Sequence, residues 1–442
     1  MESGYKTKEN EEENLLDSSE KTQINEELFS LYHQEQIFEQ ELPDKMTEYF
    51  EILKTEDKIN KIKSTLLFFA DNLDKLIQME LLNPTQDLIQ LIMIILNIIN
   101  NRKIDTEAYL FSIFIIRQSL IEYELSIEPA EFLTIHNICR NILENCQFIS
   151  ETEERLIIHC FEILLELFKR RKQIESYQQT EFPPILQLII NILNNPESYS
   201  QPILMKAFDL CTSLYQAHWQ IYTQFLRLNF VEICFNYIRI RNEIAPFALN
   251  SFSMIFKMCD EAIGQFPEDF LGLFVSLIFE EVNPSITEAA IKCLDEMSIS
   301  TEFRRRILEI PNVIFNLLTI DNSFTIRSSA LRLVHSLFYE EDTEIMTHAL
   351  EEFVDFTPFC HLIDTDDPKI IFQALEVLRL IVIKLKNLVP FPPILVTLLQ
   401  TTELMEQLES IKTDDEDSRL SEIQNMLDED INDVLQREDC PV

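Results

Sequence analysis

The chain has 442 residues, of which only three are glycine, and a formal net charge of −40 at pH 7. Glycine supplies positive-φ turns and the backbone nests that bind phosphate, so its scarcity argues against β-sandwich, Rossmann and P-loop folds. The excess of acid argues against binding to nucleic acids and anionic membranes. It favours basic protein partners through electrostatic steering. The alternative is that the acid only keeps an apolar-rich chain soluble.

Nine cysteines are scattered along the chain without a CxxC pair, and the first residues lack the apolar segment of a signal peptide. This usage predicts reduced, buried thiols in a protein of the cytoplasm, the nucleus or both. The most apolar run, Leu88–Ile99, is too short to span a bilayer and predicts a buried helix.

The first segment, residues 1–40, is strongly acidic. Residues 1–30 carry nine acids and three lysines, which predicts a largely disordered arm that becomes helical near Glu26–Gln40. Apolar residues at helical spacing then predict four helices, which fit two or three degenerate repeat units. These helices are Ser64–Leu81, Gln86–Asn100, Glu107–Leu125 and Ala130–Gln147.

Beyond residue 150 a short pattern recurs about every 42 residues, the period of two- or three-helix solenoid units. A small residue is followed by a bulky apolar one, a polar one and two mostly apolar ones. The small residues are Cys160, Ala207, Ala248, Ala290, Ala330 and Ala374. We expect each to let neighbouring helices approach closely, so that a larger side chain there would overpack by roughly 1–3 kcal/mol.

An apolar helix and a polar turn precede the last five of these small residues. The predicted helices are Ile185–Asn195, Phe230–Ile240, Phe270–Glu280, Asn312–Asp321 and Phe359–Asp366. Asn, Asp and Pro in the turns predict the end of one helix and the cap of the next. The chain then ends in an acidic segment, residues 412–442, where Ser418–Leu435 predicts a capping helix. The predicted solenoid therefore covers residues 41–411.

These units resemble armadillo repeats, most clearly from Leu308 to Leu385. The family unit has a short first helix, an apolar second helix, an Asp or Asn turn and a third helix centred on Ala-Leu; HEAT units share much of this signature. The resemblance covers residues 150–411 and, more loosely, 45–149. It implies an all-α, right-handed α-solenoid of about seven to nine armadillo-like repeats. Met405–Asp430 is similar to the last repeat of importin alpha, the nuclear import adaptor.

The likeness to importin alpha implies a site on the third helices, where that family lines a concave groove with Trp and Asn ladders. The positions that match the Trp ladder hold Glu162, Asp209, Asn250, Lys292, Arg332 and Glu376. Those that match the Asn ladder hold Glu166, Ser213, Met254, Glu296, Ser336 and Leu380. None of them holds its ladder residue, and the family's basic N-terminal arm is acidic here.

We therefore predict a partner-binding surface of different chemistry on the concave face. Its candidate residues are Glu162, Glu166, Asp209, Ser213, Asn250, Lys292, Arg332 and Glu376. Glu162, Glu166 and Asp209 would form an acidic stretch opposite the basic Lys292 and Arg332, and this polarity could orient a peptide. The alternative is an ordinary solvated helix face.

Motifs for catalysis or metal binding are missing from the sequence. His136-x-x-Cys139, with His159-Cys160, has the residue types of a zinc site but not its paired spacing, so buried helix-face residues are expected. Neither HExxH nor GxSxG nor a Gly-rich loop occurs. The basic clusters Lys169–Lys172 and Arg304–Arg306 are typical of helix ends, the alternatives being a docking patch or a nuclear-targeting signal. We expect no enzyme activity, metal, cofactor or small-molecule substrate.

The sequence thus predicts a non-enzymatic protein-binding scaffold or adaptor whose partner is a protein or peptide, with basic character favoured by charge. Two alternatives remain. One is a divergent importin-alpha-like adaptor for nucleocytoplasmic transport that binds basic cargo signals. The other is a structural subunit of a larger complex, held through apolar patches.

Overall fold

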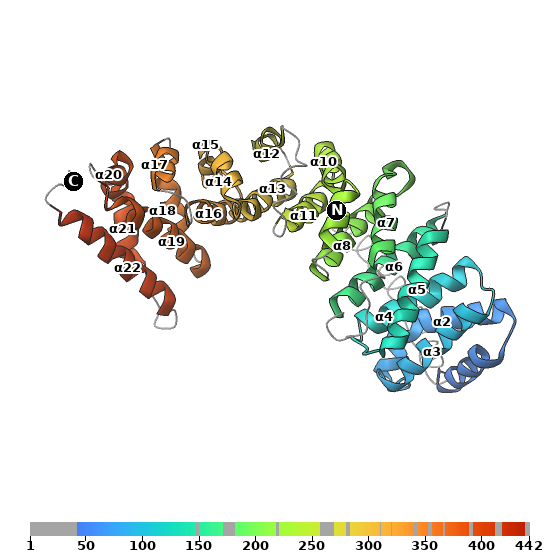
Figure 1. Cartoon of the computed structure of the whole chain (residues 1–442). Coiled ribbons are helices and arrows are strands. Elements are labelled where there is room, and N and C mark those ends of the chain that lie inside the picture. Colours follow the sequence, from blue (N-terminus) through green and yellow to red (C-terminus); the bar gives the residue numbers. More distant parts are fainter. Residues whose placement is uncertain are drawn as a thin grey trace, which may run out of the picture. The chain divides into compact units, whose positions relative to one another are not determined.

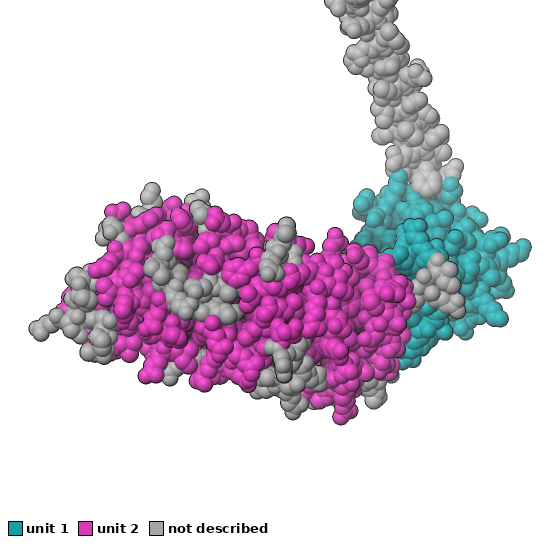
Figure 2. Space-filling model, turned by 90° about the horizontal axis from the view of Figure 1, so that it is seen from above, with its two compact units in different colours: residues 1–167 teal, residues 168–442 magenta. Residues whose placement is uncertain are grey.

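The computed structural model describes residues 42–146, 150–170, 182–217, 221–256, 269–279, 283–309, 311–319, 321–339, 343–351, 356–365, 367–388, 392–411 and 418–437. Within these ranges every regular element is helical. The chain forms two compact units, residues 1–167 and 168–442 (Figure 2). The predicted acidic arm, residues 1–40, lies outside the described residues.

Unit 1 is built from packed helices that the apolar pattern locates to within a few residues. After a helix at residues 42–55 come α2 (Ile59–Gln78), α3 (Gln86–Asn101), α4 (Thr106–Ile121), α5 (Pro129–Asn145) and α6 (Glu151–Arg170), which ends in unit 2. Helix α4 packs against α2 and α3, and α3 also contacts α5. The predicted burial of the apolar run in α3 holds for one side of the helix: Leu88, Leu91 and Ile95 are fully buried, whereas Ile89 and Met93 are exposed.

Unit 2 is a stack of helices in two layers, which Figure 1 shows side by side. In one layer each helix packs against the next: α8 (Gln201–Ala217), α11 (Ala245–Phe256), α13 (Pro284–Met297), α16 (Phe324–Tyr339), α19 (Pro368–Leu385) and α22 (Ser418–Leu435). We call this the third-helix layer. The other layer covers its first five members in order with α7 (Phe182–Leu193), α10 (Phe230–Ile240), α12 (Phe270–Phe279), α15 (Pro311–Asn316) and α18 (Thr357–Ile363).

Five further helices of six to nine residues lie between the members of these two layers along the chain. They are α9 (Tyr222–Arg227), α14 (Thr301–Leu308), α17 (Thr343–Glu351), α20 (Pro393–Gln400) and α21 (Thr402–Ser410). Helix α14 packs on α17, α17 packs on α20, and α21 packs on α18 and α20. Each of these helices therefore contacts helices of its own repeat and of the adjoining repeat, as in a repeat protein. The predicted all-α solenoid is confirmed.

The small residues of the repeat lie where their spacing predicts, between stacked helices. Cys160, Ala207, Ala248, Ala290, Ala330 and Ala374 are all 0 % exposed. Close approach is visible between α8 and α11, where the Ser251 hydroxyl donates to the Phe208 carbonyl oxygen at 2.9 Å. The same hydroxyl lies 2.8 Å from Thr212 Oγ1. A side chain larger than alanine or cysteine at these positions would hold the helices apart.

Polar turns cap the helices as predicted. The Asn283 side chain accepts a hydrogen bond from the Ser285 amide at 3.0 Å, and Asp367 accepts one from the Lys369 amide at 2.9 Å. A proline follows each cap as the first helical residue, where its missing N–H costs nothing. These turns fix where α13 and α19 begin.

Helices α15 and α18, which cover α16 and α19, end three or more residues before their predicted ends. Helix α15 ends at Asn316 because its carbonyl oxygen accepts bonds from Thr319 Oγ1 at 2.8 Å and Asn322 Nδ2 at 2.9 Å, in place of a further helical turn. Helix α18 spans Thr357–Ile363 instead of Phe359–Asp366, since Pro358 favours an earlier start.

At the end of α2, a glutamate occupies a backbone position that usually holds glycine. Glu80 has φ 58° and follows the helix in a Schellman arrangement, with the Leu81 amide donating to the Leu76 carbonyl oxygen at 2.9 Å. Glycine is the usual residue there because a Cβ in the left-handed region costs roughly 1–2 kcal/mol. Glu124, Asn229 and Arg241 also have positive φ values.

Replacing Glu80 with glycine is therefore expected to raise the free energy of unfolding, by about 1 kcal/mol. The side chain is exposed, so little contact is lost. Urea unfolding followed by circular dichroism measures the change. As a control, Asp71→Gly inside α2 should lower stability by roughly 0.3 kcal/mol, the difference between the helix propensities of aspartate and glycine. A loss of stability in Glu80→Gly would contradict the strain argument.

Candidate protein-binding surfaces

The predicted site residues lie on the solvent-accessible side of the helices that carry them. Glu162, Glu166, Asp209, Ser213, Asn250 and Glu376 are half-buried, and Lys292 and Arg332 are exposed. In each repeat the fully buried small residue comes two positions earlier, as with Ala290 and Lys292. The six of these residues that belong to unit 2 lie on neighbouring helices, from α8 to α19. Glu162 and Glu166 share one side of α6 in unit 1.

Several charges on this side bind the neighbouring repeat helix. Glu162 accepts a hydrogen bond from Arg117 Nε of α4 at 2.8 Å, and Arg117 Nη1 lies 2.6 Å from Glu122. Glu162 also lies 3.5 Å from His159 Nδ1. Reversing the charge of Glu162 would place a cation against Arg117, so this change would disturb folding as well as any partner.

The same arrangement recurs in unit 2. Arg332 Nη2 of α16 lies 3.2 Å from Asp295 Oδ2 of α13. Asp430 of α22 binds Arg379 Nε at 3.0 Å and Lys386 Nζ at 2.7 Å, both from α19. These ion-pair partners were not identified from the sequence, because they lie about 40–50 residues apart in the chain. They could have been found by searching for opposite charges separated by about one repeat period. Partly exposed pairs of this kind contribute about 0–1 kcal/mol each.

Two other predicted residues differ in their surroundings. Burial raises the pKa of the Asp209 carboxyl, while the positive charges of Lys206 and Lys169 offset part of this shift. The Asp209 carboxyl is thus partly shielded from water, and the nearby lysines of the same chain offset part of its negative charge. Lys292 is exposed and makes no ion pair with any residue that the structure describes. It is the clearest charge available to a partner among the eight.

A groove runs between α19 and α22 and includes Glu376. It consists of two adjoining hollows of about 320 and 310 Å³ that share Phe372 and Arg419. Half-buried Phe372 and Met426 form its apolar part, with the largely buried Ile423. Its exposed charges are Lys369, Arg419 and Glu422. We call it the α19–α22 groove.

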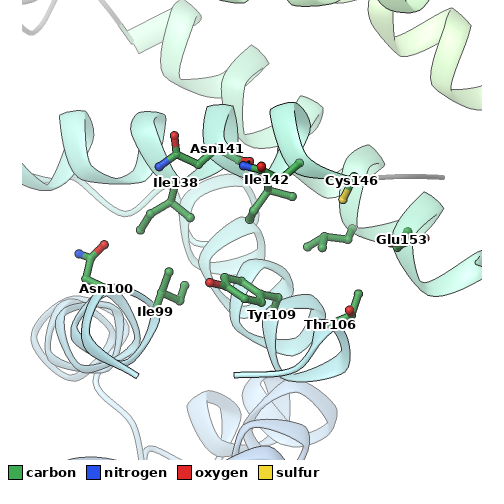
Figure 3. Close-up of a pocket in the computed structure, with 11 residues that line it drawn as sticks. Ile99, Asn100, Thr106, Tyr109, Ile138, Asn141, Ile142, Cys146 and Glu153 are labelled. Carbon is green, nitrogen blue, oxygen red and sulfur yellow. The ribbon is translucent and has the colours of Figure 1, made fainter. Parts of the chain in front are cut away.

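Unit 1 holds a separate cavity of about 480 Å³, drawn in Figure 3. Its floor consists of the buried Ile99, Ile138, Ile142 and Leu156, from α3, α5 and α6. Its rim carries the exposed side chains of Asn100, Thr106, Asn141 and Asn145. We call it the unit 1 cavity.

The histidine and cysteine residues of the predicted cluster are packed in the core. His136, Cys139 and Cys160 are fully buried. Burial lowers the pKa of His136 to about 4, helped by the charge of Arg140. Burial raises the pKa of Cys160 well above its usual value. Within the described ranges no three or more His, Cys, Asp or Glu side chains are grouped to hold a metal ion.

The basic clusters end or cap helices. Lys169 and Arg170 close α6, whereas Arg171 and Lys172 lie outside the described residues. Arg304 is buried, and its Nη1 donates to the Ser298 carbonyl oxygen at the end of α13 at 3.1 Å. This bond favours the helix-end interpretation for Arg304, since cations stabilise helix C-termini.

In the part of the chain that the structure describes, the helices are all too short or too polar to cross a membrane.

The sequence of this chain matches no family model and no curated protein. Solved structures match its fold. An engineered protein aligns with a TM-score of 0.54 and 11 % identity over 87 % of this chain and 98 % of its own. A crystal structure of importin beta gives a TM-score of 0.53 and 12 % identity over 90 % of this chain and 53 % of its own.

Yeast importin-beta, Kap95p, in a structure that describes its binding to RanGDP, gives a TM-score of 0.55 and 10 % identity. That alignment covers 91 % of this chain and 53 % of Kap95p, so the chain spans about half the length of the importin-beta structures. At such low identity the likeness shows the fold alone. The chain is an α-solenoid of helical repeats.

Proposed function

We propose that this chain is a non-enzymatic protein-binding scaffold or adaptor that uses the accessible side of its third-helix layer. The observation that carries the proposal is the α19–α22 groove. There, half-buried Phe372 and Met426 lie between exposed charges of both signs. An apolar strip bounded by polar residues is typical of a site for a helix or peptide.

Similar folds support this proposal. Kap95p, which shares the fold, binds RanGDP. We also propose armadillo-type units, because a short helix precedes the packed pair in α9–α10–α11, α14–α15–α16 and α17–α18–α19. The solenoid would cover residues 41–411 between acidic ends. The net charge of −40 favours a basic partner, in the cytoplasm or the nucleus.

The test is capture of partners by the tagged full chain from its own cells, at low and high salt, with identification by mass spectrometry. The variant Phe372→Glu/Met426→Glu places charge in the apolar part of the groove. Phe279→Glu is the control, since Phe279 is a 49 % exposed aromatic residue of α12 outside the groove. We expect the groove variant to lose at least one partner that the control retains, with binding of the purified partner at least tenfold weaker.

The outcomes separate the alternatives. If wild type, the groove variant and Phe279→Glu captured the same partners, the groove would be excluded as the binding site. If no partner were enriched over a tag-only control, the scaffold function would be excluded. Recovery of importin beta and basic nuclear proteins, lost at high salt, would favour an import adaptor. Titration with a basic signal peptide then decides, since affinity weaker than millimolar at low salt excludes that role. A salt-resistant set of partners would indicate a subunit of a larger complex.

A further inference from the structure

The unit 1 cavity lies where α3 is followed by α4 and α5 is followed by α6. The C-terminal ends of α3 and α5 and the N-terminal ends of α4 and α6 surround it. The predicted surface residue Glu162 lies nine residues further along α6 than the lining residue Glu153. The cavity is thus a different surface from the predicted concave face.

The floor of the cavity is already formed. In Figure 3, Ile138 and Ile142 of α5 point toward Ile99 of α3 and Tyr109 of α4. Because three helices hold these side chains, an apolar group can enter without rearranging the backbone. The volume of about 480 Å³ falls within the range of roughly 300–1,000 Å³ that is usual for ligand sites.

The rim offers hydrogen-bonding groups of the kind that pair with a peptide main chain. The carboxamides of Asn100 and Asn141 are exposed and make no hydrogen bond to any described residue. Asn145 Nδ2 donates to the Asn141 carbonyl oxygen at 2.7 Å, which leaves Asn145 Oδ1 as an acceptor. A carboxamide carries a carbonyl oxygen and N–H donors, as a peptide unit does.

The spacing of two of these carboxamides fits an extended chain. Asn141 and Asn145 are one turn apart on α5, about 6 Å along the helix axis. Two residues of an extended peptide span about 6.6 Å, and alternate residues present their main-chain groups to the same side. The two carboxamides can therefore bind successive main-chain groups on one side of an extended segment.

Acidic residues dominate the α6 end of the cavity. Glu151, Glu153 and Glu154 all lie in the first turn of α6. Glu153 is held in place, because its Oε2 accepts from the Ser150 amide at 3.1 Å and from the Ser150 hydroxyl at 3.3 Å. Beside it, burial and the Glu153 charge raise the pKa of Cys146 to about 11, so that the thiol stays neutral. This end favours a cation on the ligand.

We propose that the unit 1 cavity binds an extended segment of a partner protein, resting on the protein-binding function proposed above. One aliphatic side chain of the segment enters between Ile99, Ile142 and Leu156. Its main chain bonds to Asn141 and Asn145, and a lysine or arginine lies toward the first turn of α6.

The experiment uses a phage-displayed library of random twelve-residue peptides, selected on the full-length chain. Enriched peptides are synthesised with a fluorescent label, and their affinity is measured by anisotropy. The test variant is Asn141→Ala/Asn145→Ala, which removes both carboxamides at exposed helical positions. The control is Asn97→Ala/Asn101→Ala, another exposed i,i+4 asparagine pair, on α3 outside the cavity lining. Matching thermal unfolding curves establish that both variants fold.

We expect enriched peptides to combine an aliphatic residue with a nearby lysine or arginine. Their Kd should rise at least tenfold with the test variant and stay within twofold with the control. Failure to enrich any peptide, or equal affinity for both variants, would overturn the inference. A further outcome is a peptide that binds Asn141→Ala/Asn145→Ala as tightly as wild type and binds Phe372→Glu/Met426→Glu more weakly. That result would support the protein-binding function and exclude the unit 1 cavity as its site.

Discussion

Replacing Ala290 with leucine is expected to lower the free energy of unfolding by about 1–3 kcal/mol. Ala290 is 0 % exposed in α13, which packs against α11 on one side and α16 on the other. Protein interiors are close-packed, so three added carbons must displace a neighbouring helix or adopt a strained rotamer. Because a repeat protein is stabilised by contacts between adjacent units, the loss should separate the stack at this point.

Urea unfolding of the full chain measures this loss, and the matched control lies two residues away. Lys292→Leu introduces the same side chain into the same helix at an exposed position, where it should change stability by less than about 0.5 kcal/mol. If Ala290→Leu were as stable as Lys292→Leu, close packing of the third-helix layer would not depend on its small residues. A broader or two-step transition for Ala290→Leu alone would support separation of the stack.

The repeat could be predicted because it rests on local constraints that the sequence states directly. A helix buried on one side shows apolar residues at helical spacing, and a close helix contact requires a small side chain. The period of about 42 residues therefore identified six positions that the structure buries completely, from Cys160 to Ala374. Helices α10 and α22 begin and end at the predicted residues for the same reason.

Helix ends and charge partners were harder to predict, since they depend on contacts that no short window contains. Helix α15 ends early because side chains from the following turn bind the Asn316 carbonyl oxygen. The predicted site residues are half-buried or exposed, and that they bind a partner stays a prediction. The sequence did not show which of their charges are already paired. Arg117 and Asp295 were not selected from the sequence, although they bind Glu162 and Arg332.

Neither the α19–α22 groove nor the unit 1 cavity follows from periodicity. Each is a gap between helices of adjoining repeats, and its lining residues have ordinary helical spacing within their own helices. Phe372 and Met426 meet only because α22 packs on α19. The asparagines of α5 can be recognised as part of a candidate binding site only when the structure shows Ile99 and Leu156 lining the same cavity. Sites of this kind require the packing of whole repeats, which the sequence pattern does not give.

His136 is expected to make the protein lose stability as the pH falls below about 6.5. Burial lowers its pKa in the folded protein to about 4, whereas the unfolded chain has the ordinary value of 6.5. Above pH 6.5 the imidazole is neutral in both states, and this contribution to stability is fully present. Between pH 6.5 and 4 the unfolded chain binds a proton that the folded protein excludes, so stability falls by about 1.4 kcal/mol per pH unit.

Urea unfolding of wild type and His136→Phe at pH 7.5 and 5.5 isolates this contribution, and both values lie above the isoelectric point of about 4.4. We expect wild type to lose about 1.4 kcal/mol more than the variant between the two pH values. His348→Phe is the control and should behave as wild type, because the His348 side chain is 84 % exposed. Equal losses in wild type and His136→Phe would mean that His136 titrates normally, and that water reaches the interior of unit 1 between α5 and its neighbours.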